Sequence, residues 1–88
     1  MASSGQITIA AAGTAQAGPA TSGITIAIKA MVGNAGNVYV GNDAAADVTS
    51  LNGFELAPGE GVTVKKPLVS FWFDAATSGD KLCWLELE

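Results

Sequence analysis

The chain has 88 residues, which suits one domain and leaves no room for a second core. Its net charge is −4, with four lysines and no arginine, which argues against a nucleic-acid partner because phosphate recognition needs a basic face. Only 14% of the residues are charged and 49% are apolar, so we expect a partner to cover part of the surface.

The usual supports of a very small domain are missing from the sequence. Cys83 is the only cysteine and there is no histidine, so we expect neither an intramolecular disulfide nor a zinc site. Surface scaling predicts that a chain of this size buries about 63% of its unfolded surface, which is a thin margin. We therefore expect support from a homo-oligomer. Residues 1–5 carry no basic region and the apolar run 7–12 is interrupted, so we expect neither a signal peptide nor a membrane span. The free thiol of Cys83 fits synthesis in a reducing cytoplasm.

Apolar and polar residues alternate with period two along most of the chain, which is typical of strands. Residues 6–10 alternate and then enter an Ala/Gly/Thr-rich stretch, so residues 1–23 are expected to form a flexible or weakly stranded N-terminal arm. The domain proper is expected over residues 24–88. It opens with the clearest strand, 24–30, in which Ile24, Ile26 and Ile28 share one face.

The middle of the chain reads as hairpins. Residues 33–37 are rich in Gly and Asn, and Val38–Gly41 is expected to return from this turn as the second strand of a hairpin. Residues 42–49 are ambiguous between a loop and one helical turn. Two short strands, 53–56 and 62–65, flank Pro58-Gly59, which is the residue pair of a type II turn.

The last third predicts two longer strands. Residues 68–73 carry bulky side chains on both faces, which is typical of a central strand. A turn at 77–80 leads into a final strand, 81–88, which we expect to lie at a sheet edge. Together the pattern predicts an all-β fold, a small antiparallel β-sandwich or barrel of about seven short strands.

No set of residues predicts catalysis. A serine or cysteine nucleophile would lack its usual histidine base, and Cys83 is expected to be a buried, inert thiol within the last strand. The Gly-rich turn at 33–37 lacks the Gly-Lys-Ser/Thr ending of a phosphate loop. We therefore expect no enzyme and no cofactor.

The four aspartates fall in or beside predicted loops. Asp74 and Asp80 flank one turn, and Asp43 and Asp47 lie four residues apart. We interpret all four as solvated loop acids, because a chain of short strands offers little material for a cleft between two carboxylates. A calcium site that uses Asn42 with Asp43 and Asp47 does not match the EF-hand spacing, so no metal is expected.

The aromatic residues all fall on predicted strands, and most of them are expected in the core. Tyr39 and Trp72 are the expected exceptions. With Leu85 and Leu87 of the last strand they are the candidate interface residues. Such a surface suits a subunit contact or stacking on a sugar or peptide.

From Ile24 onward the sequence resembles small virion-associated proteins of tailed bacteriophages. The likeness lies in residues 36–41 (Gly-Asn-Val-Tyr-Val-Gly), in a Gly-Phe-x-Leu-x-Pro-Gly-Glu hairpin at 53–60, and in the Gly-Asp-x-Leu of 79–82. The resemblance implies a non-enzymatic protein of the capsid surface that decorates or cements the shell by contacts with the major capsid protein, with a trimer favoured. An alternative is a glycan- or receptor-binding module of a phage head or tail fibre, using Trp72, Tyr39 or the loop acids.

Overall fold

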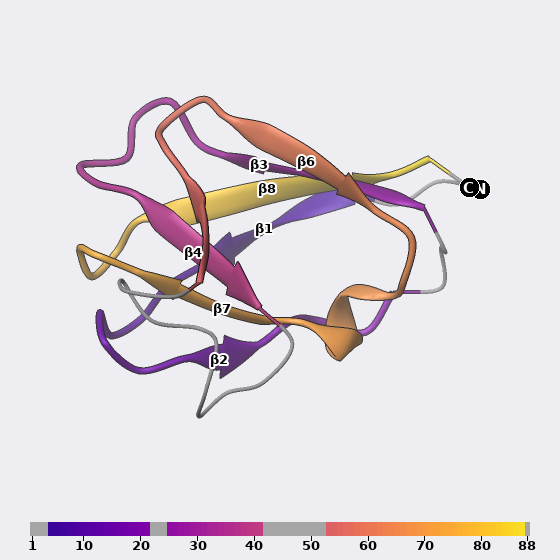
Figure 1. Ribbon diagram of the computed structural model, residues 1–88, viewed down its shortest axis with the longest axis horizontal. Coiled ribbons are helices and arrows are strands. Elements are labelled where there is room, and N and C mark those ends of the chain that lie inside the picture. Colours follow the sequence, from indigo (N-terminus) through magenta and orange to yellow (C-terminus); the bar gives the residue numbers. More distant parts are fainter. Residues whose placement is uncertain (1–3, 22–24, 42–52, 88) are drawn as a thin grey trace.

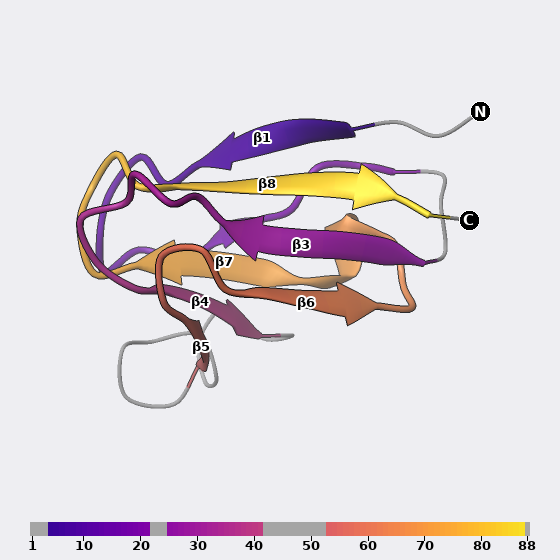
Figure 2. The same cartoon turned by 90° about the horizontal axis from the view of Figure 1, so that it is seen from above.

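A computed structural model describes residues 4–21, 25–41 and 53–87 of the chain, which form two antiparallel four-stranded sheets packed face to face (Figures 1 and 2). Sheet A has the order β1 (Ser4–Thr8), β8 (Lys81–Glu86), β3 (Ile26–Ala30) and β6 (Gly61–Val64). Sheet B has the order β2 (Gln16–Ala17), β7 (Trp72–Ala75), β4 (Val38–Gly41) and β5 (Phe54–Leu56). The predicted all-β sandwich is confirmed, with eight described strands where about seven were expected.

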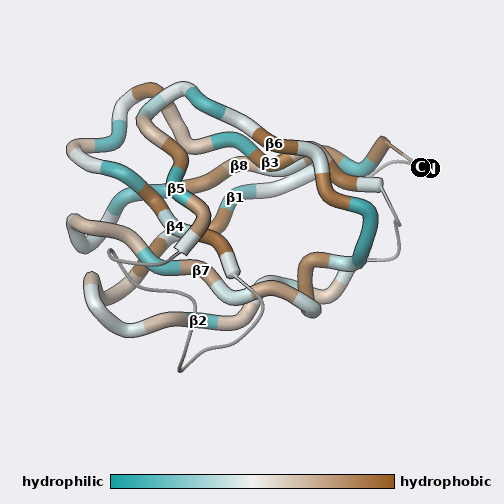
Figure 3. Tube along the Cα trace, viewed as in Figure 1, coloured by the Kyte–Doolittle hydropathy of each residue, from teal (hydrophilic) through white to brown (hydrophobic). Residues whose placement is uncertain are grey.

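The core lies between the two sheets and follows from the alternation of the strands. In β3 the inward Ile26 and Ile28 are buried while Lys29 is exposed, as the sequence pattern predicts. Figure 3 shows the same alternation as a change of colour from residue to residue along the strands. Ile24 lies outside the described residues. The side chains that fill the core are Ile7, Ile9, Ile26, Ile28, Ala30, Val38, Val40, Leu56, Leu68, Phe73, Ala75 and Leu82.

The last strand is central, which corrects the expectation that it lies at an edge. β8 pairs with β1 on one side and with β3 on the other, so that Leu82 lies between Ile7 and Ala30. Leu82 is fully buried because β8 has a neighbouring strand on each side. The sheet edges among the described residues are β1 and β6 in sheet A, and β2 and β5 in sheet B.

Residues 4–21 contribute a strand to each sheet, whereas the sequence suggested a flexible or weakly stranded N-terminal arm over residues 1–23. β1 is a strand of sheet A and β2 a strand of sheet B, and Ile7 and Ile9 lie in the core. The Ala/Gly-rich composition allows close contact rather than preventing order. At Gly18 a Cβ atom would lie 2.2 Å from the Leu68 carbonyl oxygen, so only glycine fits there.

Neither expected hairpin forms, because both connections cross from one sheet to the other. β3 lies in sheet A and β4 in sheet B, and β5 and β6 are divided in the same way. β3 already has β8 and β6 as its two neighbours, so no edge remains for β4. The turn chemistry at Pro58-Gly59 is nevertheless correct: Gly59 has φ of 90°, and the Glu60 amide donates to the Ala57 carbonyl oxygen at 2.8 Å.

The segment expected as one strand over 68–73 begins instead as a short 3₁₀ helix, η1 (Leu68–Ser70), which the strand β7 follows. Two amides close it, from Ser70 to the Pro67 carbonyl and from Phe71 to the Leu68 carbonyl, each at 3.0 Å. This helical turn directs the Leu68 side chain into the core, where it is fully buried. β7 is central, between β2 and β4, as its bulky residues predicted.

Candidate interaction surface

Asp80 and Lys81, just before and at the start of β8, hold the Gly/Asn-rich turn after β3 by hydrogen bonds. The Asp80 carboxylate accepts hydrogen bonds from the Ala35 and Gly36 amides, each at 3.0 Å. The Asn34 side chain pairs with both backbone groups of Lys81, at 2.8 and 2.9 Å. The turn amides that could bind an external anion therefore already hold a carboxylate of the chain itself.

Asp74 and Asp80 are thus not solvated loop acids, as the sequence suggested, but are buried. Asp74 is only 3% exposed, and its carboxylate accepts from the Gly13 amide at 3.0 Å and from the Ala75 amide at 2.8 Å. Both acids serve to hold turns, since each satisfies amides that strand pairing leaves free. The other acid pair, Asp43 and Asp47, lies outside the described residues together with Asn42.

Two of the four predicted interface residues lie on the outer face of sheet B. Tyr39 is opposite Asp74 and Glu55 in the register, and only 5% of its surface is exposed. Burial, and then the carboxylates of Glu55 and Asp74, raise the pKa of the Tyr39 phenol above its ordinary value. Trp72 is half-buried. Tyr39 therefore has almost no surface to offer a partner, and Trp72 keeps some.

The other two predicted residues are exposed but belong to sheet A. Leu85 is 47% exposed on the outer face of β8, and Leu87, just beyond the strand, is 50% exposed. The structure therefore does not bring the four candidates into one patch. Beside Leu85, Cys83 is half-buried rather than buried as expected, and its thiol donates to the Lys29 carbonyl oxygen at 3.6 Å.

The two long sides of the sandwich differ in how they are closed. On the β1–β2 side, the Gln16 amide bridges the sheets: it donates to the Thr8 carbonyl oxygen at 3.1 Å and accepts from the Ala10 amide at 3.2 Å. On the β5–β6 side, inward-facing apolar residues are only partly covered. We call this side, with Phe54, Val62, Val64 and Phe71, the open side.

Phe54 is the most exposed member of the open side. It stands opposite Val40 in the register, so its side chain is on the face of sheet B that bears the core. Val40 is buried, yet Phe54 is 58% exposed, because β5 is the last strand of sheet B among the described residues. Val62 and Val64 of β6 face inward in the same way, opposite Ile28 and Ile26, and are partly buried. The core thus reaches the surface along this side.

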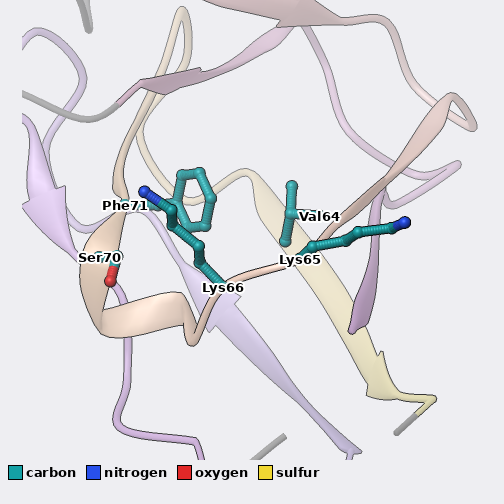
Figure 4. Close-up of a pocket in the computed structure, with 5 residues that line it drawn as sticks. All are labelled: Val64, Lys65, Lys66, Ser70 and Phe71. Atoms are coloured by element: carbon teal, nitrogen blue, oxygen red, sulfur yellow. The ribbon is translucent and has the colours of Figure 1, made fainter. Parts of the chain in front are cut away.

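A hollow of about 360 Å³ lies on the open side, between the end of β6 and η1. Figure 4 shows the side chains of Val64 and Phe71 facing each other across it. Lys66 extends beside the Phe71 ring, and Lys65 points away on the other side of the strand. Ser70 completes the lining. The hollow therefore has apolar walls, and the ammonium group of Lys66 stands at its rim.

None of the residues that line the hollow was predicted from the sequence to form an interface. The Lys65-Lys66 pair was a usable signal, because lysines are common where an edge strand must be protected from uncontrolled pairing. The exposure of Phe54 had no local signal, since an edge strand and a central strand show the same alternation.

Fold and surface together define a small antiparallel β-sandwich with an open side and with the buried Asp74 and Asp80 engaged in turns. Comparison with protein-family models, with curated proteins and with solved structures found no match. Within the described ranges, no helix has the length and apolar character needed to cross a membrane. The same ranges contain no group of three or more cysteine and acidic side chains that could hold a metal ion.

Proposed function

We propose that the chain is a non-enzymatic structural protein that decorates or cements the capsid of a tailed bacteriophage through protein–protein contacts, as a homo-oligomer. The observation that carries the proposal is the open side, where Phe54 and the inward residues of β6 leave the core partly uncovered. An exposed apolar surface of this kind on a small domain is typical of a contact with another protein.

The resemblance to virion-associated proteins supports the same proposal. Its motifs are widely separated in the sequence but meet in space, because Asp80 of the closing motif binds the Gly36 amide of the first. Tyr39 and Val40 of the first motif also pair with Glu55 and Phe54 of the second. The motifs therefore describe one structural unit, and the assignment to a virion rests on the resemblance.

The proposed action is mechanical rather than chemical. A decorating protein that binds only the assembled shell stabilises that shell by mass action, since disassembly would require its release. The major capsid protein is the proposed partner and the capsid surface the proposed location. A trimer, which the resemblance favours, would let one body contact several neighbouring capsid subunits at once.

Electron microscopy of phage particles made with and without this chain tests the proposal. We expect additional density on the head surface only when the chain is present, and a higher disruption temperature of the decorated particles. Particles that are identical in both respects would refute a decorating role. A glycan array is the matched control: saturable sugar binding lost on Trp72→Ala would favour the receptor-binding alternative instead.

A further inference from the structure

We propose that the open side is the docking site for a second copy of this chain, with Phe54 of one copy filling the hollow between Val64 and Phe71 of the next. In this contact Glu55 of the first copy lies against Lys65 and Lys66 of the second. The inference rests on the self-association in the proposed function and does not depend on what particle the oligomer joins.

The apolar half of the contact is a ring and a space that suits it. Phe54 is 58% exposed at the edge of sheet B, which is costly for a large aromatic side chain in water. The hollow has a volume of about 360 Å³ and walls of Val64 and Phe71, so it offers an aliphatic group and an aromatic ring to an incoming side chain. Association would remove both apolar surfaces from water together.

The charged half of the contact is complementary in the same order along the chain. Glu55 follows the exposed Phe54 directly, and Glu55 is itself exposed. Lys65 and Lys66 follow Val64 directly and are also exposed. Two of the four lysines of a chain with net charge −4 thus stand beside the hollow, Lys66 at its rim and Lys65 directed away from it. This arrangement favours a partner whose edge strand carries an aromatic ring on its inner face and a carboxylate on its outer face.

A second copy fits that description because the chain presents both halves itself. β5 and β6 are the edge strands on the same long side of the sandwich (Figure 2), and the hollow begins at the end of β6. The contact can then be reciprocal about a two-fold axis or can pass from copy to copy around a closed ring such as a trimer. The mass of the oligomer distinguishes the two arrangements.

Size-exclusion chromatography with light scattering tests the inference. The full chain is expected to have a mass of at least twice the 8.8 kDa of one copy. Phe54→Asp, and separately the double variant Lys65→Glu/Lys66→Glu, should weaken self-association by about tenfold or more. Adding Glu55→Lys to the double lysine variant should restore the wild-type mass, because the charges are then exchanged across the contact.

Matched controls keep the test specific. Lys29→Glu/Lys81→Glu gives the chain the same total charge as the Lys65→Glu/Lys66→Glu variant, and Leu85→Asp places a charge at an exposed apolar residue on the outer face of sheet A. Both should keep the wild-type mass, and circular dichroism should show the same strand content in every variant. A monomeric wild-type chain, or dissociation by Leu85→Asp but not by Phe54→Asp, would overturn the inference.

Capsid binding separates this inference from the proposed function. If the chain oligomerises as described but does not bind phage heads, the decorating role fails and the contact stands. If a monomeric wild-type chain still binds heads, the contact fails and the decorating role stands.

Discussion

Replacing Asp80 tests the view that a buried carboxylate, rather than a hairpin, fixes the path from β3 to β4. Asp80 is 7% exposed and accepts two backbone hydrogen bonds at 3.0 Å. A hydrogen bond to a charged group contributes about 1.5 kcal/mol or more to stability, so Asp80→Ala should cost about 3 kcal/mol. Asp80→Asn keeps one acceptor oxygen but turns an NH₂ group toward the second amide, and should cost about 2 kcal/mol.

Urea unfolding followed by tryptophan fluorescence measures these costs. For a domain of this size, 3 kcal/mol corresponds to a fall of about 12–24 °C in Tm. Glu60→Gln is the charge-matched control. Glu60 is exposed, and a glutamine carbonyl oxygen can still accept from the Ala57 amide, so its effect should stay within about 0.5 kcal/mol. Equal unfolding midpoints for Asp80→Ala and Glu60→Gln would refute the stabilising role of the Asp80 carboxylate.

Three further predictions concern other buried contacts. The pKa of the Tyr39 phenol is raised above 10.0, so the stability that its protonated form contributes should be fully present below pH 10 and should be lost as the pH rises through the folded-state pKa. The Tyr39→Phe variant lacks this group, so its free energy of unfolding should fall less than that of the wild type between about pH 8 and about pH 11. Gly18→Ala should cost about 2 kcal/mol or more in urea, whereas Gly33→Ala, where a new Cβ meets nothing within 4 Å, should be nearly neutral. The Trp84 indole N–H is buried and has no hydrogen-bond partner among the described residues. Trp84→Phe should therefore change the free energy of unfolding by less than about 1.5 kcal/mol. A larger loss would indicate that the indole N–H donates a hydrogen bond in the folded protein.

The strands and turns of this protein could be predicted because their signals are local. The alternation of Ile26 and Ile28 with Lys29 determines which face of β3 is buried, whatever strands lie beside it. The type II turn at Pro58-Gly59 likewise needs only the fixed φ of proline and the positive φ open to glycine. The order of the motifs also carried the resemblance on which the proposed function draws.

The pairing of the strands could not be predicted, because the same local signals fit several arrangements. A turn that closes a hairpin and a turn that crosses between sheets use the same residue types, so β3 and β4 read as neighbours although they lie in different sheets. β8 was expected at an edge, yet its place between β1 and β3 depends on strands far away in the sequence.

The sequence by itself determined an all-β domain of short antiparallel strands, since period-two alternation and turn residues act over a few positions. Only the tertiary structure decided that Asp80 is buried and accepts two backbone hydrogen bonds, because the amides that donate to it lie 45 and 44 residues away in the sequence. It also decided that Tyr39 is covered while Phe54 is exposed. Exposure depends on whether a further strand or layer lies against a residue, and no local pattern carries that information.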